Sequence, residues 1–277
     1  MQTIQEYVPA SAKLPRRSSA VSQILRALKN DLDTGVRADA WPLHGGPSAF
    51  KGRVLVANTD AVRHRAWRMA YRVYSSCGYV PPDPNGMITS AFDASPTTFT
   101  LLVEDEHGRE AATVTLVFDS ENNLPCDEIF APELTALRGQ GRKLVEVTRL
   151  AIDDAHTGSK QLLVVLFNFI FVFARRIRGF DDFVIEVNPR HVNYYRRLLL
   201  FEVAGSERPC PRVNGAPAVL LRVDLGSGER EVRRVGGHGD RAQERTLFPH
   251  FYAWKEECVL SKFLESHHRH HVTRIAV

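Results

Sequence analysis

Alternating apolar and polar positions predict a series of strands in the middle of the chain. The segments Thr98 to Asp105 and Glu110 to Asp119 are rich in β-branched residues, and His107-Gly108 between them is typical of a hairpin turn. A third segment, Leu144 to Ile152 (LVEVTRLAI), also alternates and indicates a strand. Further strands are predicted at residues 54–58, 182–187, 201–204 and 219–223.

Apolar residues at helical spacing predict helices between these strands. A helix from Ala61 to Cys77, with Asp60 as its N-cap, ends at Gly78. Residues 160–178 are ambiguous, because their β-branched content favours a strand whereas their length and basic end favour a helix, which we predict. Other helices are predicted at residues 21–32, 191–200 and 248–266, a loop or short helix at 125–137, and a Gly-rich charged linker at 226–240.

The order of these elements predicts an α/β (α+β) fold in which a mixed, mostly antiparallel sheet carries helices on both faces. We divide the chain into three parts. Residues 1–45 form an N-terminal extension with one helix, residues 46–235 form the main domain, and residues 236–277 form a C-terminal helical appendage. The two extensions are expected either to shield the main domain or to contact a membrane surface.

Composition narrows the class of protein. The chain has 277 residues and a net charge of +4, without the dense basic stripe of a nucleic-acid binder. Its four cysteines are far apart, which argues against a zinc site or disulfide framework and favours the cytoplasm. The start of the chain lacks the apolar region of a secretory signal. The apolar run at residues 162–174 is too short to span a membrane and is expected to be core.

Three segments resemble the N-acyl amino acid synthases, a branch of the GNAT acyltransferases related to the acyl-homoserine lactone synthases. They are Ala66 to Val80 (AWRMAYRVYSSCGYV), Leu124 to Asp153, which contains an ExxR strand, and Val187 to Gly205 (VNPRHVNYYRRLLLFEVAG). The resemblance covers roughly residues 53–225. It implies a GNAT-like sheet that is splayed at its central strands to admit the pantetheine arm of an acyl thioester.

Glu146 and Arg149 are the catalytic candidates on the ExxR strand. The resemblance implies that Glu146 helps to deprotonate or orient the acceptor amine, while Arg149 binds a carboxylate or fixes the glutamate. Residues three apart on a regular strand point to opposite faces, so the pair can act together only if a bulge intervenes. A structural ion pair at a strand edge is the alternative.

Other candidates surround the expected acceptor site. Arg68 and Arg72 are one helical turn apart and share a face. Asp93 resembles an acidic residue that faces the amine, and Tyr79 and Phe92 are expected to line the pocket. Solvent-facing arginines and an ordinary loop aspartate are the structural alternatives for Arg68, Arg72 and Asp93.

The donor side is expected after the ExxR strand. The resemblance to GNAT enzymes implies a tyrosine here that protonates the departing thiolate. Tyr194 is the candidate for this role and Tyr195 for substrate binding, and packing in the core is the alternative for one of the two. Residues Gly158, Ser159 and Lys160 open a helix where GNAT enzymes bind the pantetheine pyrophosphate. They lack the full pattern of that loop, which favours an acyl carrier protein over coenzyme A as the donor.

No tightly bound cofactor or metal is expected, and the co-substrate is an acyl-phosphopantetheine thioester. Basic residues that can meet an acidic carrier protein, or form an ordinary solvated face, are Lys143, Lys160, Arg175, Arg176 and Arg178. The histidine-rich stretch at residues 267–271 is expected to be a non-specific tail rather than a metal site.

The leading hypothesis is an enzyme that transfers a long-chain acyl group from an acyl carrier protein to the amine of an amino acid. The apolar residues 162–173 and Phe201 are candidate walls of the acyl cavity. One alternative is an acyl-homoserine lactone synthase, against which the absence of a family arginine at Ala70 argues. The others are a coenzyme A-dependent GNAT N-acetyltransferase and a binding module without activity.

Overall fold

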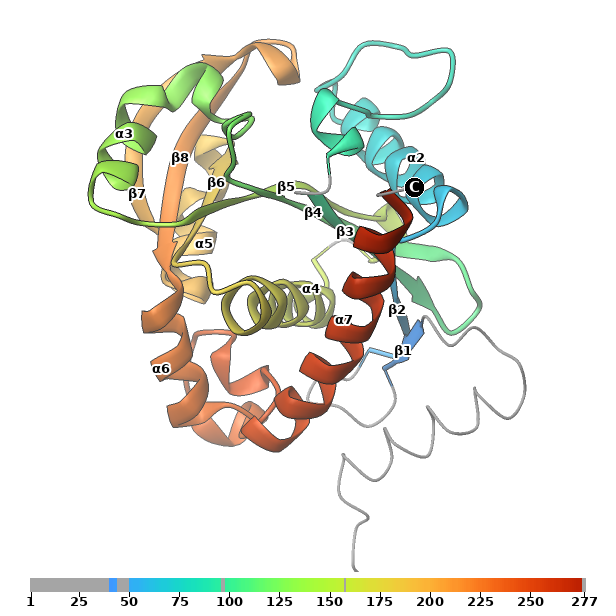
Figure 1. Cartoon of the computed structure of the whole chain (residues 1–277), viewed down its shortest axis with the longest axis vertical. Coiled ribbons are helices and arrows are strands. Elements are labelled where there is room, and N and C mark those ends of the chain that lie inside the picture. Colours follow the sequence, from blue (N-terminus) through green and yellow to red (C-terminus); the bar gives the residue numbers. More distant parts are fainter. Residues whose placement is uncertain (1–39, 44–49, 96–97, 157, 276–277) are drawn as a thin grey trace, which may run out of the picture.

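The structure, a computed structural model, describes residues 40–43, 50–95, 98–156 and 158–275, so the helix predicted at residues 21–32 lies outside the described residues. Within them, eight strands form one sheet in the order β1-β2-β3-β4-β5-β6-β8-β7 (Figure 1). All neighbours are antiparallel except β5 and β6, which are parallel. The strands are β1 (Ala40–Pro42), β2 (Gly52–Val56), β3 (Thr98–Asp105), β4 (Glu110–Phe118), β5 (Leu144–Ile152), β6 (Asp182–Val187), β7 (Glu202–Cys210) and β8 (Ala216–Asp224). The predicted mixed, mostly antiparallel sheet is confirmed.

Helices cover both faces of this sheet, as the sequence predicts (Figure 1). One face carries α2 (Asp60–Ser76) and α3 (Asp127–Gly139), and the other carries α4 (Lys160–Phe171), α6 (Leu225–Val235) and α7 (Trp254–Ile275). The short helix α5 (Val192–Leu199) follows β6. The sheet therefore separates two cores, and the side chains of each strand alternate between them.

The ambiguous apolar segment forms the central helix α4. Every residue from Leu162 to Phe171 is buried, because the sheet packs on one side of this helix while α6 and α7 enclose the other. A helix that is apolar all round is typical of such a position. It ends in a π-helical turn, η3 (Val172–Ile177). No helix in the described part of the chain combines the length and apolar character that crossing a membrane requires.

The linker predicted at residues 226–240 is wrong, because most of it forms α6. Asp224 caps this helix by accepting a hydrogen bond from Ser227 N at 2.5 Å, and Val232 and Val235 are buried on its inner face. At Gly228, α6 packs against α4 and the segment after α6, since a Cβ there would lie 3.4 Å from the ring of Phe171 and 3.7 Å from that of Phe248. Tertiary packing thus overrides the weak helix propensity of the glycines.

Smaller differences concern the ends of elements. The N-cap of α2 is Thr59, whose hydroxyl accepts from Val62 N at 3.4 Å, rather than Asp60. The C-terminal helix begins at Trp254 instead of residue 248, and the strand predicted at 201–204 continues to Cys210. The segment at 125–137 is helical in α3.

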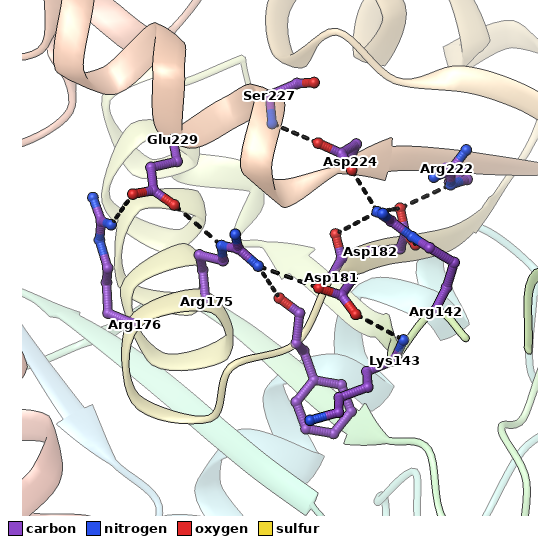
Figure 2. A network of polar contacts seen from close by, with 11 residues as sticks. Arg142, Lys143, Arg175, Arg176, Asp181, Asp182, Arg222, Asp224, Ser227 and Glu229 are labelled. Atoms are coloured by element: carbon purple, nitrogen blue, oxygen red, sulfur yellow. Dashed lines mark hydrogen bonds and ion pairs between the residues drawn. The ribbon is translucent and has the colours of Figure 1, made fainter. Parts of the chain in front are cut away.

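A network of ion pairs ties together the ends of β5, β6 and β8 (Figure 2). Arg142, just before β5, donates from Nε to Asp182 Oδ2 at 2.5 Å and also binds Asp224 at the end of β8. Arg222 donates from Nε to Asp182 Oδ1 at 2.8 Å. The side chain of Asp182 is fully buried. The network therefore fixes β5 against β6 at the end where Leu144 pairs with Asp182.

Candidate active site

β5 and β6 part from each other a short way beyond this fixed end. The two strands pair only from Leu144 to Glu146 on β5 and from Asp182 to Val184 on β6. The rest of β6 pairs with β8 alone, while the rest of β5 pairs with β4 alone. The sheet is therefore splayed at its central parallel strands, as expected.

Strand β5 contains a bulge just beyond the residues that pair with β6. Thr113 on β4 opposes Ala151, but Thr115 opposes Thr148, so two residues of β5 oppose one of β4. Arg149 lies in this bulge with φ of 49°, a left-handed conformation that is uncommon for a residue with a Cβ. The predicted bulge is thus present, and Glu146 and Arg149 both find their partners on the face covered by α2 and α3.

Glu146 is buried where the two strands part. Its Oε2 accepts a hydrogen bond from the backbone N–H of Cys126, just before α3, at 2.7 Å. Burial, reinforced by the negative charge of Glu186, raises the pKa of Glu146 to about 8. The carboxyl group is therefore mostly protonated at neutral pH.

Glu186 on β6 is a site residue that the sequence analysis missed. Its Oε2 forms an ion pair with Arg212, which also binds Glu128 at the start of α3. Burial raises the pKa of Glu186, although the Arg212 charge opposes this shift. The signal in the sequence was a charged residue between the apolar Ile185 and Val187, inside a predicted strand (DFVIEV).

Arg149 and Asp93 form a buried ion pair. The guanidinium binds both carboxylate oxygens of Asp93, one of them at 2.9 Å, and donates to the carbonyl oxygen of Ile88 at 3.2 Å. Asp93 also accepts from Ser90 N at 2.7 Å, and Phe92 packs beside the core under α3. The pair joins the bulge of β5 to the loop after α2, so Arg149 fixes Asp93 rather than Glu146.

The predicted tyrosines occupy different surroundings. Tyr195 packs between the rings of Phe167 and Phe201, with ring centroids 6.2 and 5.9 Å away, and burial raises its pKa. Tyr194 is 40% exposed. Its ring centroid lies 5.9 Å from that of Tyr195. The structure thus makes Tyr195 the core residue and leaves Tyr194 the accessible one.

Two further aromatic residues come from α2 and the loop after it. Burial raises the pKa of Tyr74 to about 12, and the charges of Arg149 and Glu186 both act on its hydroxyl. The Tyr79 ring lies 6.0 Å from that of Tyr74, and its hydroxyl accepts from Arg190 at 2.8 Å. Tyr74 and Arg190 are site residues without a signal of their own in the sequence.

The arginines of α2 lie at the edge of this region. Arg72 forms an ion pair with Asp153, immediately after β5, at 2.8 Å. Arg68 is exposed and has no ion-pair partner among the described residues. Neither side chain has a contact that links it to the Glu146 and Glu186 carboxyl groups.

The segment predicted to bind the donor lies at the start of α4. Gly158 has φ of 77°, and Ser159 is the N-cap, its hydroxyl accepting from Leu162 N at 3.3 Å. Lys160 Nζ lies 3.4 Å from His250 Nε2. Because α4 follows the end of β5, this segment is at the end of the sheet where β5 and β6 are apart.

The basic residues predicted to meet a carrier protein are largely engaged within the protein. Arg175 binds Asp181 at 3.3 Å and Glu229 at 3.2 Å (Figure 2). Arg176 also binds Glu229, and Arg178 stacks over the ring of Phe118 at 4.5 Å. Intramolecular contacts therefore orient the guanidinium groups of these three arginines, and their contact with an acidic carrier protein stays a prediction.

An apolar cavity lies on the opposite face of the sheet, below β6 and β8. Its volume is only about 20 Å³, because aromatic rings fill the space. Tyr195 contacts two of its lining rings, those of Phe167 and Phe201. The lining residues include Phe167, Phe171, Phe183, Phe201, Phe248 and Phe251.

Metal ligation has no geometric support in the described residues. No group of three or more His, Cys, Asp or Glu side chains lies close enough together there to hold an ion. The backbone of residues 267–271 belongs to α7.

A splayed mixed sheet of this topology, with helices on both faces, defines a GNAT-like fold. A family model described as "N-acyl amino acid synthase FeeM" matches residues 65–224, more than half of the chain. The protein therefore belongs to the FeeM family of N-acyl amino acid synthases and is an N-acyltransferase.

Several solved structures are similar to this chain. The structure of FeeM, an N-acyl amino acid synthase from uncultured soil microbes, is 25% identical, with a TM-score of 0.57 over 64% of this chain and 92% of that chain. The coenzyme A-dependent acyl-homoserine lactone synthase BjaI is 15% identical, with a TM-score of 0.48 over 60% and 77% of the two chains. The lactone synthase LasI is 14% identical, with a TM-score of 0.47 over 64% and 91%. No curated protein sequence matches significantly.

Proposed function

We propose that the protein transfers a long-chain fatty-acyl group from an acyl carrier protein thioester to the amine of an amino acid. The observation that carries the proposal is the parting of β5 and β6 beside the buried Glu146. A thioester that enters between the strands meets an amine held next to this carboxyl group. The membership of the FeeM family supports an amino acid as the acceptor.

The amine attacks the thioester carbonyl directly. Its nitrogen forms a bond to the acyl carbon, the carbon–sulfur bond breaks, and the thiol leaves after taking up a proton. Cys126 is unsuited to an acyl-enzyme intermediate, because burial raises the pKa of its thiol well above the ordinary value. Glu146, mostly protonated at neutral pH, orients the nitrogen by hydrogen bonding. Backbone N–H groups of β5 beyond Glu146, which have no ladder partner on β6, can stabilise the carbonyl oxygen as it gains charge.

The acyl chain is proposed to enter the apolar cavity on the other face. Tyr195 packs against Phe167 and Phe201 in the cavity wall. The cavity, of about 20 Å³, is little larger than the about 10–15 Å³ that one water molecule requires, so a long chain enters only by displacing aromatic rings. Tyr194, at the accessible side of this pair, is the proposed proton donor to the thiolate.

Incubation of the protein with palmitoyl carrier protein, palmitoyl-coenzyme A and mixed amino acids tests the proposal. N-acyl amino acids are expected by mass spectrometry, formed faster with the carrier protein because the Gly158 to Lys160 segment lacks the full pyrophosphate-binding pattern. Thioester hydrolysis without an N-acyl product contradicts the proposed function. Faster reaction with coenzyme A contradicts only the choice of donor.

Arg190 is proposed to bind the carboxylate of the amino acid. It follows β6 at the open end, is held by the Tyr79 hydroxyl, and forms no ion pair among the described residues. We expect Arg190→Gln to raise KM for the amino acid about 10- to 100-fold, the range of a charge-assisted hydrogen bond. The amide of the same amino acid, which lacks the carboxylate, should be unaffected. Arg196→Gln on the exposed side of α5 is the matched control, and an equal effect in both variants contradicts the assignment.

A further inference from the structure

Two carboxyl groups from neighbouring strands meet where the sheet opens. Glu146 on β5 pairs with Val184, so Glu186 lies two residues further along β6 toward the open end and on the same face as Val184. Each side chain is largely removed from water, with relative exposures of 1% for Glu146 and 12% for Glu186. Because like charges disfavour each other, the negative charge of Glu186 raises the pKa of Glu146, and the two buried carboxyl groups do not both ionise near neutral pH.

Their contacts decide which of the two carries the negative charge. Arg212 forms its ion pair with Glu186, whereas Glu146 is bound by the neutral N–H of Cys126. The guanidinium stabilises an adjacent carboxylate far more than an amide N–H does. Glu186 is therefore the ionised member of the pair and Glu146 the protonated one.

One oxygen of Glu186 has no partner. Oε2 is bound by Arg212, but Oε1 is buried and accepts no hydrogen bond from the described residues. A buried acceptor without a donor is destabilising, so its presence at a candidate active site calls for a donor supplied by the substrate. An ammonium group is the donor that matches a carboxylate in charge.

The reaction also requires two protons to leave the nitrogen. An acceptor ammonium carries three protons and the amide product carries one; the thiolate takes up one of the two that are lost, and the other must reach solvent through a base. We propose that Glu186 is a further catalytic residue, whose Oε1 binds the acceptor ammonium and takes its first proton while Arg212 holds Oε2. The inference rests on the proposed function and leaves the orienting role to Glu146.

Several titratable or charged groups interact electrostatically with Glu186, and each of them contributes to the pH dependence of a reaction in which Glu186 takes part. They are Glu146 on β5, Glu128 on α3, Tyr74 on α2, Cys126 before α3, Cys210 on β7 and Arg212 in the turn after β7. Arg212 is the cation of this set that touches Glu186 directly. A variant at Glu186 therefore has to be compared with wild type at each pH.

The test compares wild type, Glu186→Gln, Glu186→Asp and the control Glu207→Gln in acyl transfer to an amino acid at pH 7 and pH 9.5. Glu207 lies exposed on β7. We expect Glu186→Gln to lose about 100- to 1,000-fold in kcat/KM at pH 7, the usual contribution of a general base. The loss should shrink to less than about tenfold at pH 9.5, where the amine loses its proton in solution. Glu186→Asp should retain part of the activity and Glu207→Gln all of it.

The outcomes separate this inference from the function on which it rests. A wild-type protein that yields no N-acyl product overturns the proposed function and the inference with it. An active wild type with Glu186→Gln within about threefold of it overturns only the role of Glu186. A loss of equal size at both pH values also overturns it, because a merely structural defect does not depend on the protonation of the acceptor.

Discussion

Asp182→Asn is expected to lower the free energy of unfolding by about 3–5 kcal/mol, the usual cost of removing one partner from a buried ion pair. The Asp182 carboxylate is fully buried and binds two arginines, Arg142 and Arg222. Asparagine keeps the size of the side chain but leaves both guanidinium groups facing a neutral amide. Urea denaturation at pH 7.5, followed by circular dichroism, measures the difference.

Asp240→Asn is the matched control, because the Asp240 side chain is 99% exposed. Its unfolding free energy should stay within about 0.5 kcal/mol of wild type. An Asp182→Asn protein as stable as the control shows that the network of Figure 2 does not hold β5 against β6.

Glu146→Gln is expected to stabilise the protein at alkaline pH, by on the order of 2–5 kcal/mol at pH 8. The folded state holds the pKa of Glu146 at about 8, above the ordinary 4.5. Below pH 4.5 the group is protonated in both states and has no effect. Between pH 4.5 and 8 only the unfolded chain releases the proton, so wild type loses stability by at most about 1.4 kcal/mol per pH unit. Glutamine does not titrate and lacks this loss, while its carbonyl can still accept from Cys126 N.

Unfolding free energies at pH 4, 6 and 8 measure this difference, with the exposed Glu202→Gln as control. The gap between Glu146→Gln and wild type should widen as the pH rises, whereas the control should follow wild type. A constant gap contradicts the raised pKa. Since glutamine resembles a protonated glutamate, the activity of Glu146→Gln at pH 7 should stay within about tenfold of wild type.

In the splayed sheet, some features follow from the local sequence, whereas others follow only from the pairing of residues that are far apart in the chain. The alternation of LVEVTRLAI identifies β5 and places Glu146 and Arg149 on it, because side-chain direction along a strand has a period of two residues. That period alone sends the two side chains to opposite faces. Only the register of β5 against β4 shows the bulge that brings both to the α2 and α3 face.

The sequence analysis missed several residues of the candidate site for the same reason. Glu186, Tyr74 and Arg190 come from three elements and form no motif along the chain. Only the tertiary arrangement brings Glu186 near Glu146, Tyr74 near Arg149 and Glu186, and Arg190 to the Tyr79 hydroxyl. Likewise, the basic residues after α4 resemble a docking surface in the sequence. The carboxylates that engage them, such as Glu229 and Glu257, are distant in the chain.

The sequence by itself determined most strands and helices from β2 to β8, the GNAT-like class and the strand that carries Glu146, since each depends on periodicity or motifs within short segments. It did not determine the helix α6, the partners of the buried charges, or which of two carboxyl groups ionises. Those depend on burial and on contacts between residues far apart in the chain. The free energy of a charge is set by its surroundings in space, and only the tertiary structure decided them.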